Sequence, residues 1–161
     1  MLLFVHVALS LVGLATGFVV IWGMLNARPW DRWTAVFLAT TLLTSLTGFL
    51  FPIHGFTPAI GLGLISLPVL GLAIFARYGR HLAGPWRRVY SITAVVAQYL
   101  NFFVLIVQSF MKIPGLHDLA PTQSEPPFAI AQFVALLAFV VLGILATIRF
   151  RPSTAGGGLL P

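Results

Sequence analysis

Residues 2–25 read LLFVHVALSLVGLATGFVVIWGML and decide the class of fold. The run contains no Asp, Glu, Lys or Arg. It is longer than the roughly 20 residues that a helix needs to cross a hydrocarbon layer about 30 Å thick. A backbone inside lipid must satisfy its own hydrogen bonds, and a helix does so within one segment. The stretch therefore predicts a membrane-spanning helix.

The composition of the whole chain agrees with this prediction. Of 161 residues, 59% are hydrophobic and only 7% are charged, whereas soluble domains carry roughly 25% charged residues. The net charge is +6, and the basic residues that produce it lie between the apolar runs. It therefore indicates membrane topology and no nucleic-acid partner. The absence of cysteine excludes disulfides, thiolate metal sites and iron–sulfur clusters.

Apolar runs recur along the chain and are separated by Pro, Gly and charged residues. We predict one all-α domain over residues 1–151, an integral membrane bundle of five transmembrane helices, followed by a flexible Gly-rich tail at 152–161. The predicted helices are residues 2–25, 33–51, 57–75, 89–111 and 128–148.

Basic residues predict the orientation of this bundle. With five spans, eight arginines share one side of the membrane and Lys112 alone falls on the other. Lys and Arg are enriched in cytoplasmic loops. We therefore expect the N-terminus outside and the C-terminus inside, in a bacterial inner membrane.

The first span carries an ionisable side chain, which is expensive in lipid. His6, Ser10, Gly13 and Gly17 follow helical spacing and share one face. Gly13 and Gly17 form a GxxxG pattern that permits close helix approach. We therefore expect His6 on the packed face, either as a working residue or as a buried imidazole bonded to a hydroxyl of the second span or to Gln108.

The fourth span carries a polar stripe. Gln98, Asn101, Gln108 and Lys112 lie on one side of a helix. Unsatisfied amides in hydrocarbon cost several kcal/mol each, about 4–8 on the harshest scale. The stripe must face other helices or a wet cavity. It serves either as interhelical glue or as the wall of a binding site or polar route.

Polar groups collect at the predicted outer end. His54, His117, Asp118 and Glu125 lie there, and His6 sits just below them. Imidazoles and carboxylates suit divalent metals such as Zn, Cu or Fe. His6 and His54 could alternatively hold a b-type haem, with Gln108, Asn101 and Lys112 beside it.

The stretch RYGRHLAGPWRRVY forms a predicted inner loop with Arg77, Arg80, Arg87 and Arg88. Basic clusters next to a membrane attract anionic lipids, so we expect these arginines to contact lipid headgroups or a partner. Alternatively, these arginines only set the orientation of the protein in the membrane, as basic loops commonly do.

The stretches FARYGRHLAGPWRRVY, AQYLNFFVLIVQSF and LAPTQSEPPFAIAQ resemble small multi-pass bacterial inner-membrane proteins of uncharacterised activity. The resemblance covers most of the chain and implies no functional residues.

No nucleophile–base pair or phosphate loop is visible, and no reaction can be assigned. We expect an outward-facing polar pocket that binds a small ligand or cofactor, haem b or a divalent metal among the candidates. The alternatives are an accessory subunit of a larger membrane complex, a homo-oligomer, or a small-molecule carrier that uses the polar stripe.

Overall fold

The computed structural model describes residues 1–51 and 58–151, and within these residues the chain is helical with no strand. This confirms the all-α prediction. The elements are α1 (Leu2–Leu25), α2 (Asp31–Gly48), α3 (Pro58–Ile74), the π-helical turn η1 (Phe75–Gly79), α4 (Trp86–Lys112), α5 (Pro114–Leu119) and α6 (Pro126–Arg149).

Four helices in the described part of the chain are long and apolar enough to cross a membrane: Leu2–Leu25, Ile60–Gly79, Trp86–Lys112 and Pro126–Arg149. The helix predicted at 33–51 is present as α2, but it is not one of these four. Asp31, Arg32 and several Thr and Ser residues lower its hydropathy. The count of five spans therefore stays a prediction.

Proline marks the helix starts near one end of the molecule. Pro114 opens α5, and Pro126 opens α6. Proline suits the first turn, because an N–H there has no intrahelical partner and the fixed φ is already helical. The short helix α5 lies between the last two predicted spans and is not among the five predicted helices.

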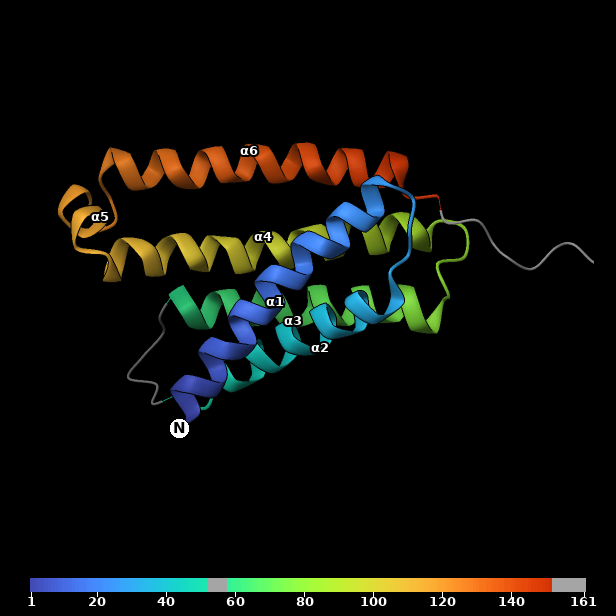
Figure 1. Cartoon of the computed structure of the whole chain (residues 1–161), viewed down its shortest axis with the longest axis horizontal. Coiled ribbons are helices and arrows are strands. Elements are labelled where there is room, and N and C mark those ends of the chain that lie inside the picture. The colour runs from blue at the N-terminus through green and yellow to red at the C-terminus, as the bar shows by residue number, and fades with distance from the viewer. Residues whose placement is uncertain (52–57, 152–161) are drawn as a thin grey trace, which may run out of the picture.

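The long helices run back and forth between two ends of the molecule (Figure 1). At one end, which we call the α5 end, lie the N-terminus, α5 and the start of α6. At the other, the arginine end, lie the α1–α2 and η1–α4 connections and the end of α6. The arginine end carries Arg28, Arg32, Arg77, Arg80, Arg87, Arg88, Arg149 and Arg151.

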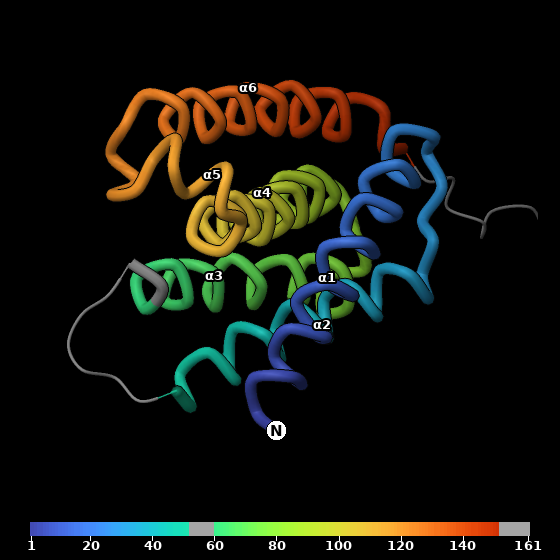
Figure 2. The backbone as a smooth tube through the Cα atoms, turned by 60° about the vertical axis from the view of Figure 1, so that its left-hand side comes forward, coloured from blue at the N-terminus to red at the C-terminus, as the bar shows by residue number. Residues whose placement is uncertain are grey.

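The helices pack around α4. Both views place α4 between α6 and α3, while α1 and α2 form a pair that crosses the bundle (Figures 1 and 2). Packing is tightest toward the arginine end. Every buried residue of α1 lies between Gly13 and Met24, and those of α2 lie between Thr34 and Thr41. The first half of α1 is largely uncovered by the described residues.

Candidate functional site

The polar stripe of α4 begins in the tightly packed core. Gln98 is fully buried, and its Nε2 donates a hydrogen bond to the carbonyl oxygen of Leu14 at 2.7 Å. A Cβ on Gly17 would lie 1.9 Å from Oε1 of Gln98. The second glycine of the GxxxG pattern therefore makes room for a carboxamide, and α1 and α4 are joined by it.

Asn101, one turn further along α4, bonds to α2. Its Nδ2 donates to Oγ1 of Thr41 at 3.1 Å, and Thr41 is buried. A Cβ on Gly13 would lie 3.0 Å from the same hydroxyl oxygen. Thus both glycines of the GxxxG pattern accommodate polar side chains of neighbouring helices. This half of the stripe joins α1, α2 and α4.

The other half of the stripe differs. Gln108 and Lys112 are exposed, near the α5 end. Neither has a side-chain hydrogen bond or an ion pair within residues 1–51 and 58–151. The structure therefore does not gather Asn101, Gln108 and Lys112 around His6 in a common hydrogen-bonded site.

His6 is half-buried and bonded to α2. Its Nδ1 lies 2.9 Å from Oγ1 of Thr47, and its ring meets Phe51 edge-on with centroids 5.2 Å apart. The Thr47 hydroxyl already donates its proton to the carbonyl of Leu43 at 2.8 Å. With that proton engaged, the tautomer that completes the contact is the neutral imidazole in which Nδ1 donates to Thr47. Nε2 then carries the lone pair, with no hydrogen-bond partner among the described residues.

The predicted metal ligands are not assembled within the described part of the chain. His117 and Asp118 are exposed on α5. No group of three His, Asp or Glu side chains in residues 1–51 and 58–151 could hold a metal ion together. His54 lies outside the described residues, so the predicted set stays a prediction.

Glu125 closes the turn before α6. Its Oε1 accepts hydrogen bonds from the hydroxyl of Thr122 at 2.8 Å and from the N–H of Thr122 at 3.2 Å, and its Oε2 accepts one from the N–H of Ser124 at 3.1 Å. Desolvation acts to raise the pKa of Glu125, but these hydrogen bonds together hold it below its usual value. The carboxylate thus has local partners that a metal would have to replace.

The arginines of the predicted inner loop have different surroundings. Arg77 is buried in η1, forms an ion pair with Asp31 of α2, and lies 5.2 Å from the ring centroid of Tyr90. π-Helical turns frequently occur at functional sites. In this protein the π-helical turn η1 carries the buried guanidinium of Arg77. Asp31 is the one side-chain carboxylate near the arginine end, a signal that could have predicted this pair.

Arg87 also has internal partners. Its guanidinium donates to the carbonyl oxygens of Phe150 and, at 3.2 Å, of Thr147. The last carbonyls of a helix lack intrahelical donors and carry partial negative charge. Arg87 therefore joins the start of α4 to the end of α6.

Arg80 and Arg88 are exposed. Arg80 lies 5.4 Å above the ring of Trp86. The guanidinium of Arg88 has no hydrogen-bond or ion-pair partner within the described ranges.

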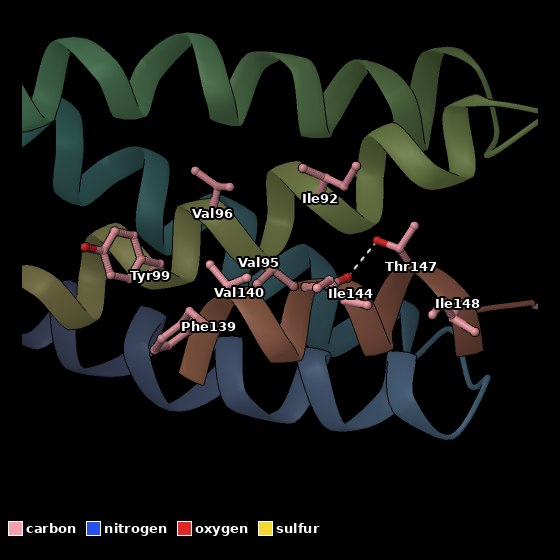
Figure 3. A pocket seen from close by; sticks show the side chains of 10 residues that line it. Ile92, Val95, Val96, Tyr99, Phe139, Val140, Ile144, Thr147 and Ile148 are labelled. Atoms are coloured by element: carbon pink, nitrogen blue, oxygen red, sulfur yellow. Dashed lines mark hydrogen bonds between the residues drawn. The ribbon is translucent and has the colours of Figure 1, made fainter. Parts of the chain in front are cut away.

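A cavity lies between α4 and α6, with a volume of about 430 Å³. Figure 3 shows its walls, which we call the α4/α6 groove; they include Ile92, Val95, Tyr99, Phe139, Gly143 and Ile144. Its one hydroxyl on α6, that of Thr147, donates to the carbonyl of Gly143 at 2.7 Å (Figure 3). The groove is therefore apolar in character.

The sequence analysis missed this groove. It expected a polar pocket at the outer end, whereas the α4/α6 groove extends to the last turns of α6, on the arginine side. Gly143 is the signal that could have pointed to it, because it interrupts a run of large apolar residues in α6. Apolar walls can bind a ligand through burial of apolar surface, at about 25 cal/mol per Å².

A scan of protein-family models found no match to this chain, and searches of curated proteins and of solved structures found none either.

Proposed function

We propose that the protein is a non-catalytic integral membrane protein of the bacterial inner membrane that binds a small apolar or amphipathic ligand in the α4/α6 groove. The observation that carries the proposal is the groove itself. Ligand sites are mostly apolar clefts of about 300–1,000 Å³, and the groove falls in this range with about 430 Å³. Ile92 and Ile144 line it while half-exposed, so a ligand could enter from the side.

We also propose that α2 is a fifth span, despite its lower hydropathy. Three of its hydroxyls bond to backbone carbonyls of the same helix: Thr40 donates to Val36 at 2.7 Å, Ser45 to Thr41 at 3.0 Å and Thr47 to Leu43 at 2.8 Å. Such bonds make hydroxyls tolerable in lipid. Leu43 and Leu46 are exposed on the face of α2 that points away from the bundle. The helix thus presents apolar residues away from the bundle, while its buried threonines, Thr34 and Thr41, face the bundle.

In this proposal the arginine end is cytoplasmic. Eight of the nine basic residues belong to it, and basic residues near span ends set orientation with the positive side inside. The α5 end and the N-terminus then face outward.

The polar stripe supports a structural task over a transport route. Gln98 and Asn101 are already bonded to Leu14 and Thr41. A polar path through the bundle would need these groups to be available to a solute. The inner half of the stripe therefore holds helices together, and the ligand site lies elsewhere.

The test is to fill the groove. Gly143→Leu adds a branched side chain where a Cβ meets only Val95, at an ordinary 3.6 Å. Gly71→Leu is the matched control, because Gly71 of α3 is exposed and its Cβ would meet nothing within 4 Å. Both variants are purified in a neutral detergent, and a pyrene-labelled fatty acid is titrated into each.

Saturable binding is expected for the parent and for Gly71→Leu. Gly143→Leu is expected to lose about tenfold or more in affinity, equivalent to about 1.4 kcal/mol. Val140→Trp, which also fills the groove, serves as a second variant with helix content checked by circular dichroism. Equal affinity in the parent and both groove variants would contradict the proposal.

A second candidate function is ligation of haem b or a divalent metal through His6. The observation that favours it is the free Nε2, since a ligating imidazole usually donates its other N–H to a neighbouring group. His54 is the proposed second ligand. His6→Phe should then abolish a Soret band or stoichiometric metal in the purified protein. A parent protein that lacks both contradicts this candidate.

A further inference from the structure

A cationic side chain, that of Arg88, lies on the same face of α4 as the residues that line the α4/α6 groove. On α4, Arg88 precedes Ile92 by four residues, and Val95 and Tyr99 follow at intervals of three and four. Residues at this spacing share one face of a helix. Arg88 therefore lies on the groove side of α4, about 6 Å beyond Ile92 toward the arginine end.

Arg88 is available to a ligand, in contrast to its neighbour. Arg87 is engaged with the carbonyl oxygens of Thr147 and Phe150, at the end of α6. Arg88 is exposed and has no ion-pair or hydrogen-bond partner in residues 1–51 and 58–151. The α4/α6 groove thus leads toward two guanidinium groups, of which that of Arg87 is engaged and that of Arg88 is not.

The groove is shorter than one leaflet of a bilayer and can lie within it. From Ile92 to Tyr99 it covers seven residues of α4, about 10 Å along the helix axis. A hydrocarbon core about 30 Å thick gives about 15 Å per leaflet. Because the groove lies toward the arginine end, a chain inside it belongs to the leaflet whose headgroups meet the arginines.

We infer that the α4/α6 groove binds an acyl chain of an anionic phospholipid from this leaflet, with the lipid phosphate against Arg88. This inference rests on the proposed ligand site and names its ligand. Guanidinium groups pair with phosphate through charge-assisted hydrogen bonds. Arg149 and Arg151 add positive charge at the same end of α6.

The charges also favour an anionic headgroup over a zwitterionic one. A choline or ethanolamine headgroup carries a cation that needs a negative partner. The chain has three acidic side chains. Asp31 is paired with Arg77, and Asp118 and Glu125 lie at the α5 end. No unengaged side-chain carboxylate in the described residues can receive the cation of such a lipid at the arginine end.

A second copy of the chain fits the groove less well. Two copies with the same membrane orientation, packed groove to groove about a two-fold axis, would bring their Arg88 side chains toward each other. Like charges placed together across an interface are unfavourable by several kcal/mol. A phosphate placed there instead would neutralise the charge.

The experiment is native mass spectrometry of the full chain in a neutral detergent. Phosphatidylglycerol and phosphatidylcholine with identical acyl chains are titrated separately. Two matched pairs of variants are compared with the parent. Arg88→Gln is paired with Arg28→Gln, an exposed arginine of the α1–α2 connection. Gly143→Leu is paired with Gly71→Leu.

The parent is expected to bind phosphatidylglycerol more tightly than phosphatidylcholine. Arg88→Gln should reduce the affinity for phosphatidylglycerol about fivefold, the change for about 1 kcal/mol per basic residue near a membrane surface. It should reduce the affinity for phosphatidylcholine less, because the choline cation offsets the charge of the phosphate that both lipids carry. Gly143→Leu should weaken both lipids. Arg28→Gln and Gly71→Leu should behave as the parent.

The failures are distinguishable. In one outcome Gly143→Leu weakens the binding of both lipids, but Arg88→Gln binds phosphatidylglycerol with the same affinity as the parent. The groove function then stands, and the anionic-lipid inference is overturned. If Gly143→Leu leaves lipid binding unchanged, both are overturned. A Gly143→Leu variant that loses a dimer while its lipid binding stays unchanged assigns the groove to a second copy, and also overturns the inference.

Discussion

Gln98 of α4 occupies the space that Gly17 of α1 leaves empty: a Cβ on Gly17 would stand 1.9 Å from the Gln98 Oε1. The same carboxamide donates to the carbonyl of Leu14 at 2.7 Å. A GxxxG pattern is usually associated with close approach of two helix backbones. Here it admits a buried polar side chain, which makes Gly17 a requirement of the core.

Gly17→Ala is therefore expected to lower the free energy of unfolding by about 1–3 kcal/mol, the usual cost of overpacking a core. Gly71→Ala is the control, because its Cβ enters open space. It should be neutral or stabilising by about 0.5–1 kcal/mol, since alanine suits a helix interior better than glycine. Unfolding in mixed detergent measures both. Equal stability of the two variants would show that Gln98 moves aside freely.

The hydrogen bond between Asn101 and Thr41 should make a small contribution to the free energy of unfolding. A double-mutant cycle with Asn101→Leu and Thr41→Val is expected to give a coupling energy of about 0.6 kcal/mol, the average for such bonds between membrane helices. A coupling energy of zero would mean that the bond contributes nothing beyond packing.

The pair of Arg77 and Asp31 should stabilise the arginine end. Asp31→Asn leaves the buried guanidinium of Arg77 without its ionic partner. Removing a partner from a buried charged group costs about 1–3 kcal/mol or more, and the low end is expected because Asp31 is 82% exposed. Asp118→Asn is the control, an exposed carboxylate on α5. Identical thermal stability of the two variants would contradict a role for the pair.

The pKa of Glu125 should respond to Thr122. The hydroxyl of Thr122 donates to the carboxylate at 2.8 Å, and the hydrogen bonds around Glu125 hold its pKa below the usual 4.5. Thr122→Val should therefore raise this pKa, as measured by carboxyl-carbon NMR during a pH titration. Thr147→Val, remote on α6, should not.

The sign of the pH effect follows from the lowered pKa. A carboxyl group with a lower pKa in the folded state contributes stability above its unfolded value, near pH 4.5. This contribution disappears as the pH falls through the folded value. Thr122→Val should thus narrow the stability difference between neutral and acidic pH. A Glu125 pKa that is insensitive to Thr122→Val would contradict the assignment.

Membrane topology can be read with fused reporters. With α2 as a span, a reporter after Pro161 should be cytoplasmic, whereas one inserted at Gln123 or within residues 52–57 should be external. If α2 does not span, residues 52–57 and the α1–α2 connection lie on the same side. A cytoplasmic signal from the 52–57 insertion alongside external labelling of the N-terminus would therefore remove α2 from the spans.

The sequence by itself was sufficient for the helical class and for the approximate helix positions. α1 covers Leu2–Leu25, the range that the apolar run predicts. The reason is local: a long uncharged stretch forms a helix in lipid because every backbone group must be satisfied within the segment. The clustering of the arginines at one end also follows from their positions between apolar runs.

Local pattern was also enough to mark residues with special surroundings, though not their partners. It singled out His6, Gly17 and Gln98, but the contact between Gly17 and Gln98 joins residues 81 positions apart in the chain. His6 is the exception: the pattern offered a hydroxyl of the second span or Gln108 as its partner, and the partner is the Thr47 hydroxyl of α2.

Which helix faces meet depends on tertiary packing. The ion pair of Arg77 with Asp31 and the groove beside Gly143 both depend on how helices rotate and cross. A soluble helix reveals its packed face by an apolar stripe. In α1 and α6 apolar residues surround the helix on nearly every side, because lipid is as apolar as the core. Periodicity therefore carries little information on orientation, and packing, glycine gaps and a few polar bonds determine it.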